Sequence, residues 1–233
     1  SPLAAAKLDC TAEEISFRSG ELVSPHGSSV SFESIVALAY TERVSLSAAG
    51  FYATPDLEWD WEVRNGRPFH YYAFGAAVTE VEIDGFTGMN HIRRVDILHD
   101  VGDSLNAAID RGQIEGAFVQ GAGWLTCEEL KWNTEGRLLT HSASTYAIPA
   151  FSDAPLEFRV SLLQDASQQK TIHGSKAVGE PPFMLAISVR EALRDAIRHF
   201  GAEASDLPSP LTGEVIKSVL GEVPSLSNPG ANF

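Results

Sequence analysis

A single carboxylate in the stretch KAVGEPP (residues 176–182) is placed where it could do chemistry. Glu180 stands between Gly179 and two prolines, directly before an apolar segment. Glycine gives the backbone conformational freedom, whereas proline fixes φ and disfavours helical geometry in the residue before it. The sequence therefore predicts a rigid, irregular turn that aims one acid, as a general base requires. The alternative is that Glu180 caps the following helix, where a carboxylate contributes about 0.3–1 kcal/mol.

A glycine-rich stretch, GQIEGAFVQGAG (residues 112–123), is the second candidate. It lies within a predicted helix over residues 107–125, where each glycine costs roughly 1 kcal/mol relative to alanine. Several glycines in one helix indicate close packing against another backbone or a ligand. A phosphate cradle is the weaker interpretation, because the core of the stretch has no lysine. Gln113 and Gln120 share one helix face, and either a heteroatom-rich ligand or a strand edge would satisfy their amides.

Other catalytic and metal-binding motifs are absent from the sequence. There is no P-loop, no GxGxxG after a strand, no GxSxG and no HExxH. The seven histidines are scattered, and no pair has the spacing of metal ligands. We therefore predict no metal-ligating residue on this chain.

Composition narrows the class of protein. The chain has 233 residues, 44% of them hydrophobic and 21% charged, which is ordinary for a globular protein. Its formal net charge of −14 argues against a nucleic-acid partner, because an acidic surface repels phosphates. No apolar run approaches the ~18 residues of a membrane span, and the first residues do not resemble a signal peptide. Cys10 and Cys127 cannot build a disulfide framework, so we expect a cytoplasmic location without membrane contact.

Hydrophobic periodicity predicts hairpins and helices around these candidates. The expected helices cover residues 31–40, with Ser31 as N-cap, and residues 107–125, 183–200 and 212–220. The expected β-structure is a small hairpin near Gly20 and Gly27, a β-rich stretch at 44–52, a long hairpin over 69–102, and strands at 128–133, 137–141 and 157–163. Residues 224–233 are expected to be loose. The pattern predicts an α+β protein in which hairpins pack on glycine-bearing helices.

Five stretches of the chain resemble one enzyme family over roughly residues 31–200. They are TERVSLSAAGFYATPDLEWDW, GRPFHYYAFGAAVTEVEIDGFTG, GQIEGAFVQGAGWLTCEEL, STYAIPAFSDAPLEFRVSLL and GSKAVGEPPFMLAISVREALRDAI. Together they resemble the C-terminal part of the molybdopterin-binding subunit of xanthine dehydrogenase, in the xanthine oxidase or molybdenum hydroxylase family. The stretches are long and collinear. The resemblance implies an α+β fold with mixed or antiparallel sheets and packed helices, in two subdomains.

The resemblance also implies a cofactor, a substrate and two site residues. The cofactor is molybdenum–molybdopterin, and the reaction hydroxylates an electron-poor ring carbon of hypoxanthine or xanthine toward urate. The family's general base is the glutamate of its GEPP motif, and its match in this sequence is Glu180. The family uses a glutamine in a GQ-x-EG motif to hydrogen-bond the pterin, and its match is Gln113. Electrons leave through [2Fe-2S] clusters to FAD, which belong to other domains or subunits.

The matched stretches suggest a piece of a longer protein. The family's other purine-orienting residues and main pterin-binding loops lie upstream of these stretches, and the chain begins with Ser1 instead of methionine. We expect residues 1–233 to be the C-terminal portion of a molybdenum-cofactor-binding domain, with a lead-in (1–30), a family-like core (31–200) and a C-terminal extension (201–233). We expect the isolated fragment to be inactive. Its expected partners are the remainder of its own subunit, an iron–sulfur/FAD subunit or domain and a purine substrate, within an oligomer.

Two alternatives stay open at this point. An aldehyde oxidase or another N-heterocycle dehydrogenase of the family would use Glu180 in the same way, because the base acts at the metal centre. A non-catalytic scaffold could keep the fold without the chemistry. The gene upstream of residue 1 would separate the scaffold from the enzymes.

Overall fold

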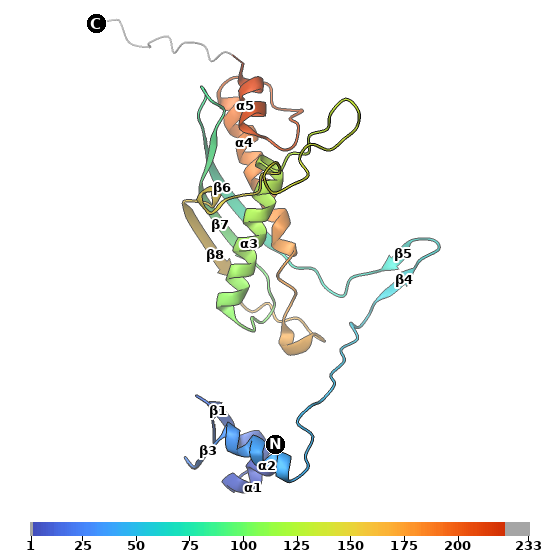
Figure 1. Ribbon diagram of the computed structural model, residues 1–233, viewed down its shortest axis with the longest axis vertical. Helices are drawn as coiled ribbons and strands as arrows, with labels where there is room; N and C mark the ends of the chain where they lie inside the picture. The colour runs from blue at the N-terminus through green and yellow to red at the C-terminus, as the bar shows by residue number, and fades with distance from the viewer. Residues whose placement is uncertain (1, 222–233) are drawn as a thin grey trace, which may run out of the picture. The chain divides into compact units, whose positions relative to one another are not determined.

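The computed structural model describes residues 2–221 of the chain, in two compact units, Ser1–Ala53 and Thr54–Phe233 (Figure 1). Each unit has its own hydrophobic core. The stretch predicted to be loose, residues 224–233, lies outside the described residues. Helices and small antiparallel and mixed sheets make up both units, so the predicted α+β fold is confirmed.

The first unit is a three-stranded antiparallel sheet with two helices. The sheet joins β1 (Ser16–Arg18), β2 (Glu21–Val23) and β3 (Ser29–Ser31), and extends the predicted hairpin by one strand. Helix α2 (Phe32–Thr41) begins as predicted, because the Ser31 side chain accepts a hydrogen bond from the Ser34 N–H at 3.2 Å. Helix α1 (Pro2–Leu8) and the turn η1 (Ala12–Glu14) were not predicted. The core of this unit consists of Ala4, Leu8, Leu22 and Ile35.

The second unit is built on a mixed sheet. Strand β6 (Gly75–Ile83) pairs antiparallel with β7 (Asn90–His99), as the predicted long hairpin requires, and β7 pairs parallel with β8 (Glu157–Leu162). The register shifts between Glu80 and Val81, which leaves Arg93 as an extra residue on β7. This bulge keeps Ile92 and Val95 on the same buried face although they are three residues apart.

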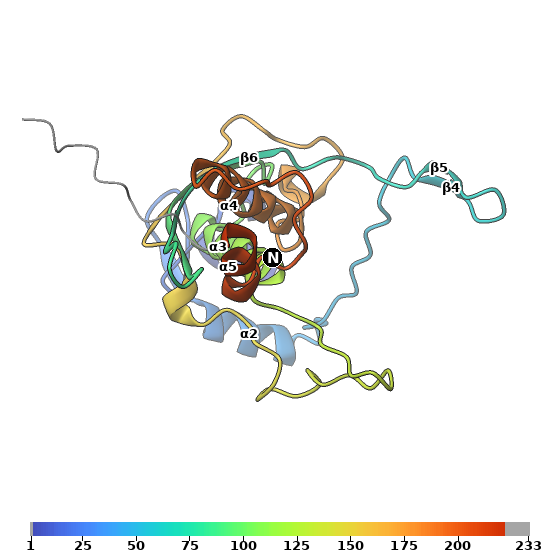
Figure 2. The same ribbon diagram turned by 90° about the horizontal axis from the view of Figure 1, so that it is seen from above.

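Helices cover one face of this sheet. The long helix α3 (Ala107–Thr126) packs against β8 (Figure 1) and against α4 (Ile187–His199). Helix α4 itself lies along β6 (Figure 2). The shared core includes Val95 and Ile97 of the sheet, Phe118 of α3 and Leu193 of α4. The short helix α5 (Gly213–Leu220) confirms the helix predicted over residues 212–220, and Thr212 is its N-cap. Among the described helices, none is long and apolar enough to cross a membrane.

Four predicted elements differ in the structure. The β-rich stretch at residues 44–52 forms no strand, because it has no pairing partner. The two strands predicted at 128–133 and 137–141 reduce to one isolated bridge between Trp132 and Leu138. The predicted helix 183–200 is divided into a 3₁₀ segment, η4 (Pro181–Ala186), and the α-helix α4, since Pro181 and Pro182 open the segment. Three short elements complete the unit: a hairpin of β4 (Glu58–Asp60) and β5 (Asn65–Arg67), η2 (Phe151–Asp153) and η3 (Ile172–Gly174).

Candidate active site

The fold brings the two candidate residues together. Gln113 lies in the second turn of α3, and Glu180 lies at the N-cap of η4. A Cβ placed on Gly179, the residue before Glu180, would sit 3.4 Å from the Oε1 atom of Gln113. The Gln113 amide therefore rests against the glycine that precedes the candidate base.

Glu180 is exposed and held by its backbone. Its carbonyl oxygen accepts a hydrogen bond from the Phe183 N–H at 3.0 Å, and Pro182 is buried. The side chain makes no capping hydrogen bond to η4 although Glu180 is the N-cap residue, so no hydrogen bond supports the capping alternative. Its carboxylate is accordingly open to a ligand.

Gly179 serves a different purpose from the one predicted for it. It is not among the glycines of residues 2–221 that have positive φ, so the backbone there does not require glycine's conformational freedom. Its missing side chain instead leaves room beside Gln113. The glycine in front of Glu180 thus permits the close approach of α3.

The four glycines of α3 fall into two pairs. A Cβ on Gly121 would lie 2.5 Å from the carbonyl oxygen of Phe183, and a Cβ on Gly123 would lie 2.2 Å from Cγ of Pro149. These two are packing glycines, as the favoured interpretation predicted. Gly112 and Gly116, by contrast, have nothing within 4 Å of where their Cβ atoms would be. Internal packing therefore explains half of the pattern, and the other half faces open space.

The open half forms one stripe along α3. Gln113, Gly116 and Gln120 follow each other at spacings of three and four residues, which places them on one face of the helix. All three are exposed. Neither amide makes a hydrogen bond within the described residues. Gly112 lies beside the stripe and adds no side chain.

This stripe fits a flat, heteroatom-rich group such as a pterin. Gly112 and Gly116 let a planar surface approach the helix backbone closely. The amide of Gln113 offers two donors and an acceptor. Within residues 2–221, no group of three or more His, Cys, Asp or Glu could hold a metal ion.

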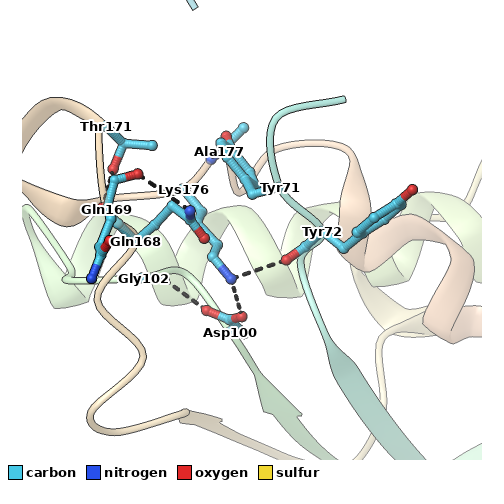
Figure 3. A network of polar contacts seen from close by, with 9 residues as sticks. All are labelled: Tyr71, Tyr72, Asp100, Gly102, Gln168, Gln169, Thr171, Lys176 and Ala177. Carbon is cyan, nitrogen blue, oxygen red and sulfur yellow. Dashed lines mark hydrogen bonds and ion pairs between the residues drawn. The ribbon is translucent and has the colours of Figure 1, made fainter. Parts of the chain in front are cut away.

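A buried ion pair, shown in Figure 3, anchors the segment before Glu180. The Nζ atom of Lys176 donates to Oδ2 of Asp100 and, at 2.9 Å, to the carbonyl oxygen of Tyr72. Sequence reasoning missed Asp100. The available signal was a carboxylate directly after the apolar run of β7, in HDVG, because an acid there needs a partner.

The surroundings of this pair change two pKa values. Burial raises the pKa of the Asp100 carboxyl, but the hydrogen bonds from Lys176 and from the Gly102 N–H, with the charge of Lys176, outweigh burial and hold it below its ordinary value. Burial lowers the pKa of the neighbouring His99, whose Nδ1 has no hydrogen-bond partner in the described structure. The negative charge of Asp100 opposes this shift without cancelling it.

Hollows in the described surface of the second unit lie beside this site instead of on it. One of about 330 Å³ is at the C-terminal half of α3, lined by Gly123 and Cys127 among others, and includes neither Gln113 nor Glu180. Another, of about 440 Å³, is lined by Tyr71, Tyr72 and Pro181. Gln113 and Glu180 line neither hollow. They are candidates because Gln113 contacts Gly179, the residue before Glu180, and because neither side chain makes a hydrogen bond within the described residues.

The chain is similar to known proteins over most of its length. The profile of the family described as "Molybdopterin cofactor-binding domain" matches residues 1–155. The chain is 53% identical over 196 residues to xanthine dehydrogenase/oxidase of Mus musculus, covering 81% of this chain and 15% of that protein. It is 48% identical over 209 residues to xanthine dehydrogenase of Oryza sativa subsp. japonica, covering 84% of this chain and 15% of that protein. The chain thus spans about 15% of the length of these two relatives.

A solved structure supports the fold. Quinoline 2-oxidoreductase from Pseudomonas putida 86 superposes with a TM-score of 0.62 at 24% identity, covering 95% of this chain and 28% of that chain. At this level of identity the match supports the arrangement of the elements only. Because the family profile covers more than half of the residues, the chain belongs to the molybdopterin cofactor-binding domain family.

Proposed function

We propose that this chain is the C-terminal portion of the molybdenum-cofactor-binding domain of a xanthine dehydrogenase, with Glu180 as the general base and Gln113 as a cofactor-binding residue. The observation that carries the proposal is the contact of Gln113 with Gly179, next to an exposed carboxylate that makes no capping hydrogen bond. The relatives at 53% and 48% identity support the choice of a purine as substrate. The alignment with the Mus musculus relative covers 81% of this chain. A stretch of that length includes positions 113 and 180 whichever end of the chain it lies nearer to.

The division of labour follows from the chemistry of the two side chains. When bound, the molybdopterin cofactor supplies the metal centre at which a ring carbon of the purine is hydroxylated. Glu180 accepts the proton at a carboxylate oxygen, and the Gly–Glu–Pro–Pro frame keeps that oxygen in one direction. Gln113 donates or accepts hydrogen bonds through its amide but is neutral at pH 7, so it binds without moving a proton.

The proposed enzyme needs redox cofactors that other regions or subunits supply. FAD and [2Fe-2S] clusters would lie outside this chain, on the remainder of the subunit or on a second subunit, within an oligomer. The short span of this chain relative to its relatives supports that view. A cytoplasmic location is supported by Cys10 and Cys127, which are both free.

The test is Glu180→Gln in the full-length holoenzyme. Glutamine keeps the size of the side chain and its hydrogen bonding but removes its basicity. We expect turnover of xanthine to fall at least about 10²-fold, the lower end for loss of a general base, with molybdenum content unchanged. Glu135→Gln, in an exposed turn of the second unit, is the matched control and should keep turnover. Wild-type turnover in Glu180→Gln would refute the assignment.

A further inference from the structure

The segment that carries Glu180 is held by contacts instead of by regular structure. Residues 176–180 form neither helix nor strand between η3 and η4. At the start of the segment, Ser175 bridges to Gly102, and the Lys176 N–H donates to the Val101 carbonyl at 2.8 Å. The next residue donates its N–H to the hydroxyl of Tyr71 at 2.8 Å. The direction of Glu180 therefore depends on what fixes these few residues.

The Lys176 side chain is the strongest of these anchors. Only 6% of it is exposed, and the Asp100 side chain is 3% exposed. Its ammonium also lies 5.8 Å from the ring centre of Tyr71 and 5.6 Å from that of Phe74. Every other ion pair of a lysine or arginine between residues 2 and 221 has partners that are at least 35% exposed. A charge pair removed from water in this way has one narrow geometry.

Asp100 is in turn fixed to the sheet. Its Oδ1 accepts from the Gly102 N–H at 2.9 Å, and its own N–H donates to the carbonyl of Phe74 at 2.8 Å. Phe74 and Asp100 directly flank the paired ends of β6 and β7, where Gly75 is opposite His99. The carboxylate is thus part of a rigid sheet end, and Lys176 transmits that rigidity to the segment after it.

We propose that the Lys176–Asp100 ion pair positions Glu180 by locking the start of its segment to the end of β7. The proposal rests on the assignment of Glu180 as the base. Three residues separate Lys176 from Glu180, and buried Pro182 fixes the other side. Val178, between them, packs on the core. Glu180 is therefore aimed by two anchors, and releasing one of them lets the carboxylate move.

If the Lys176–Asp100 ion pair only stabilised the fold, its removal would have a different effect. Replacing both partners of a buried ion pair by apolar residues of similar size is often neutral or stabilising. A double substitution, Lys176→Met with Asp100→Leu, therefore separates positioning from stability. Displacement of a reacting group by ~1 Å can cost about 10²-fold in rate. We expect the double variant of the full-length holoenzyme to lose about 10- to 10²-fold in kcat, with KM, molybdenum content and Tm close to the parent.

The decisive measurement repeats the double substitution in the Glu180→Gln background. If the pair acts through Glu180, the substitution has no further effect on kcat there, because no base remains to be aimed. A full additive loss in that background overturns the positioning role, as does unchanged kcat when Glu180 is present. Wild-type turnover in Glu180→Gln alone would instead refute the proposed base, so the two failures are distinguishable.

Two further variants keep the test interpretable. Glu82→Gln with Arg93→Gln removes an exposed ion pair on the outer face of the sheet, 3.3 Å long, and should leave kcat unchanged. If the apolar pair loses the cofactor, Asp100→Asn carries the test, since it keeps the shape of the side chain. Its kcat should fall with Glu180 present and show no further fall in the Glu180→Gln background, and wild-type kcat in Asp100→Asn would overturn the proposal.

Discussion

The packing of α3 against η4 leads to a sharp prediction for Gly121→Ala. The new Cβ would lie 2.5 Å from the carbonyl oxygen of Phe183 and 2.7 Å from the Cβ of Ala186, where ordinary contact begins at 3.4 Å. The first obstacle is backbone and the second belongs to a fully buried residue, so neither can rotate away. We expect Gly121→Ala to destabilise the chain.

The magnitude follows from two opposed effects. Overpacking of a well-packed site costs about 1–3 kcal/mol, and the rigid obstacles here favour the upper end. Alanine returns roughly 1 kcal/mol of helix propensity relative to glycine. The net loss in the free energy of unfolding is about 2 kcal/mol, which lowers Tm by about 4–8 °C for a unit of this size.

Gly116→Ala is the matched control on the same helix. Nothing lies within 4 Å of its new Cβ, so only the propensity gain of roughly 1 kcal/mol remains. We expect its Tm to rise by about 2–4 °C. Thermal unfolding of the 233-residue chain, followed by circular dichroism, measures both variants. A Gly121→Ala chain as stable as Gly116→Ala would show that the contact between α3 and η4 is not tight.

Two further predictions concern cofactor retention and pH. In the full-length enzyme, Gln113→Ala should lower molybdenum content while each loaded site keeps a similar turnover. Gln164→Ala, two residues after the end of β8, is the control. Full occupancy with lost turnover would contradict a binding role. Because burial lowers the pKa of His99 below that of the unfolded chain, the unfolded state binds an extra proton as pH falls below about 6.5, so stability is full above that pH and declines below it. His99→Leu should therefore reduce the loss of stability between pH 7.5 and 5.5, measured by urea unfolding. The same change at the exposed His91 should not reduce it. An equal loss of stability in His99→Leu and in the parent would rule out this cause.

Much of the fold could be predicted from local pattern. The long helix α3, the hairpin of β6 and β7, the N-cap Ser31 and the short helix α5 match the predictions, because hydrophobic periodicity and capping chemistry act over a few residues. The β-rich stretch predicted at 44–52 and the strands predicted at 128–133 and 137–141 failed for the opposite reason. A strand needs hydrogen-bond partners from elsewhere in the chain, and composition alone cannot supply them.

Short motifs were enough to identify the residues that could do chemistry, but contacts between distant parts of the chain arrange them. KAVGEPP marked Glu180, and GQIEG marked Gln113, as separate motifs with separate alternatives. Only the packing of α3 against the segment before η4 brings Gln113 to Gly179, and it also divides the helix glycines into packed and open pairs. The pairing of Lys176 with Asp100 likewise joins residues far apart in the chain. Such contacts depend on long-range packing, whose energy is shared among many residues, so a short stretch of sequence does not tell which residues will meet.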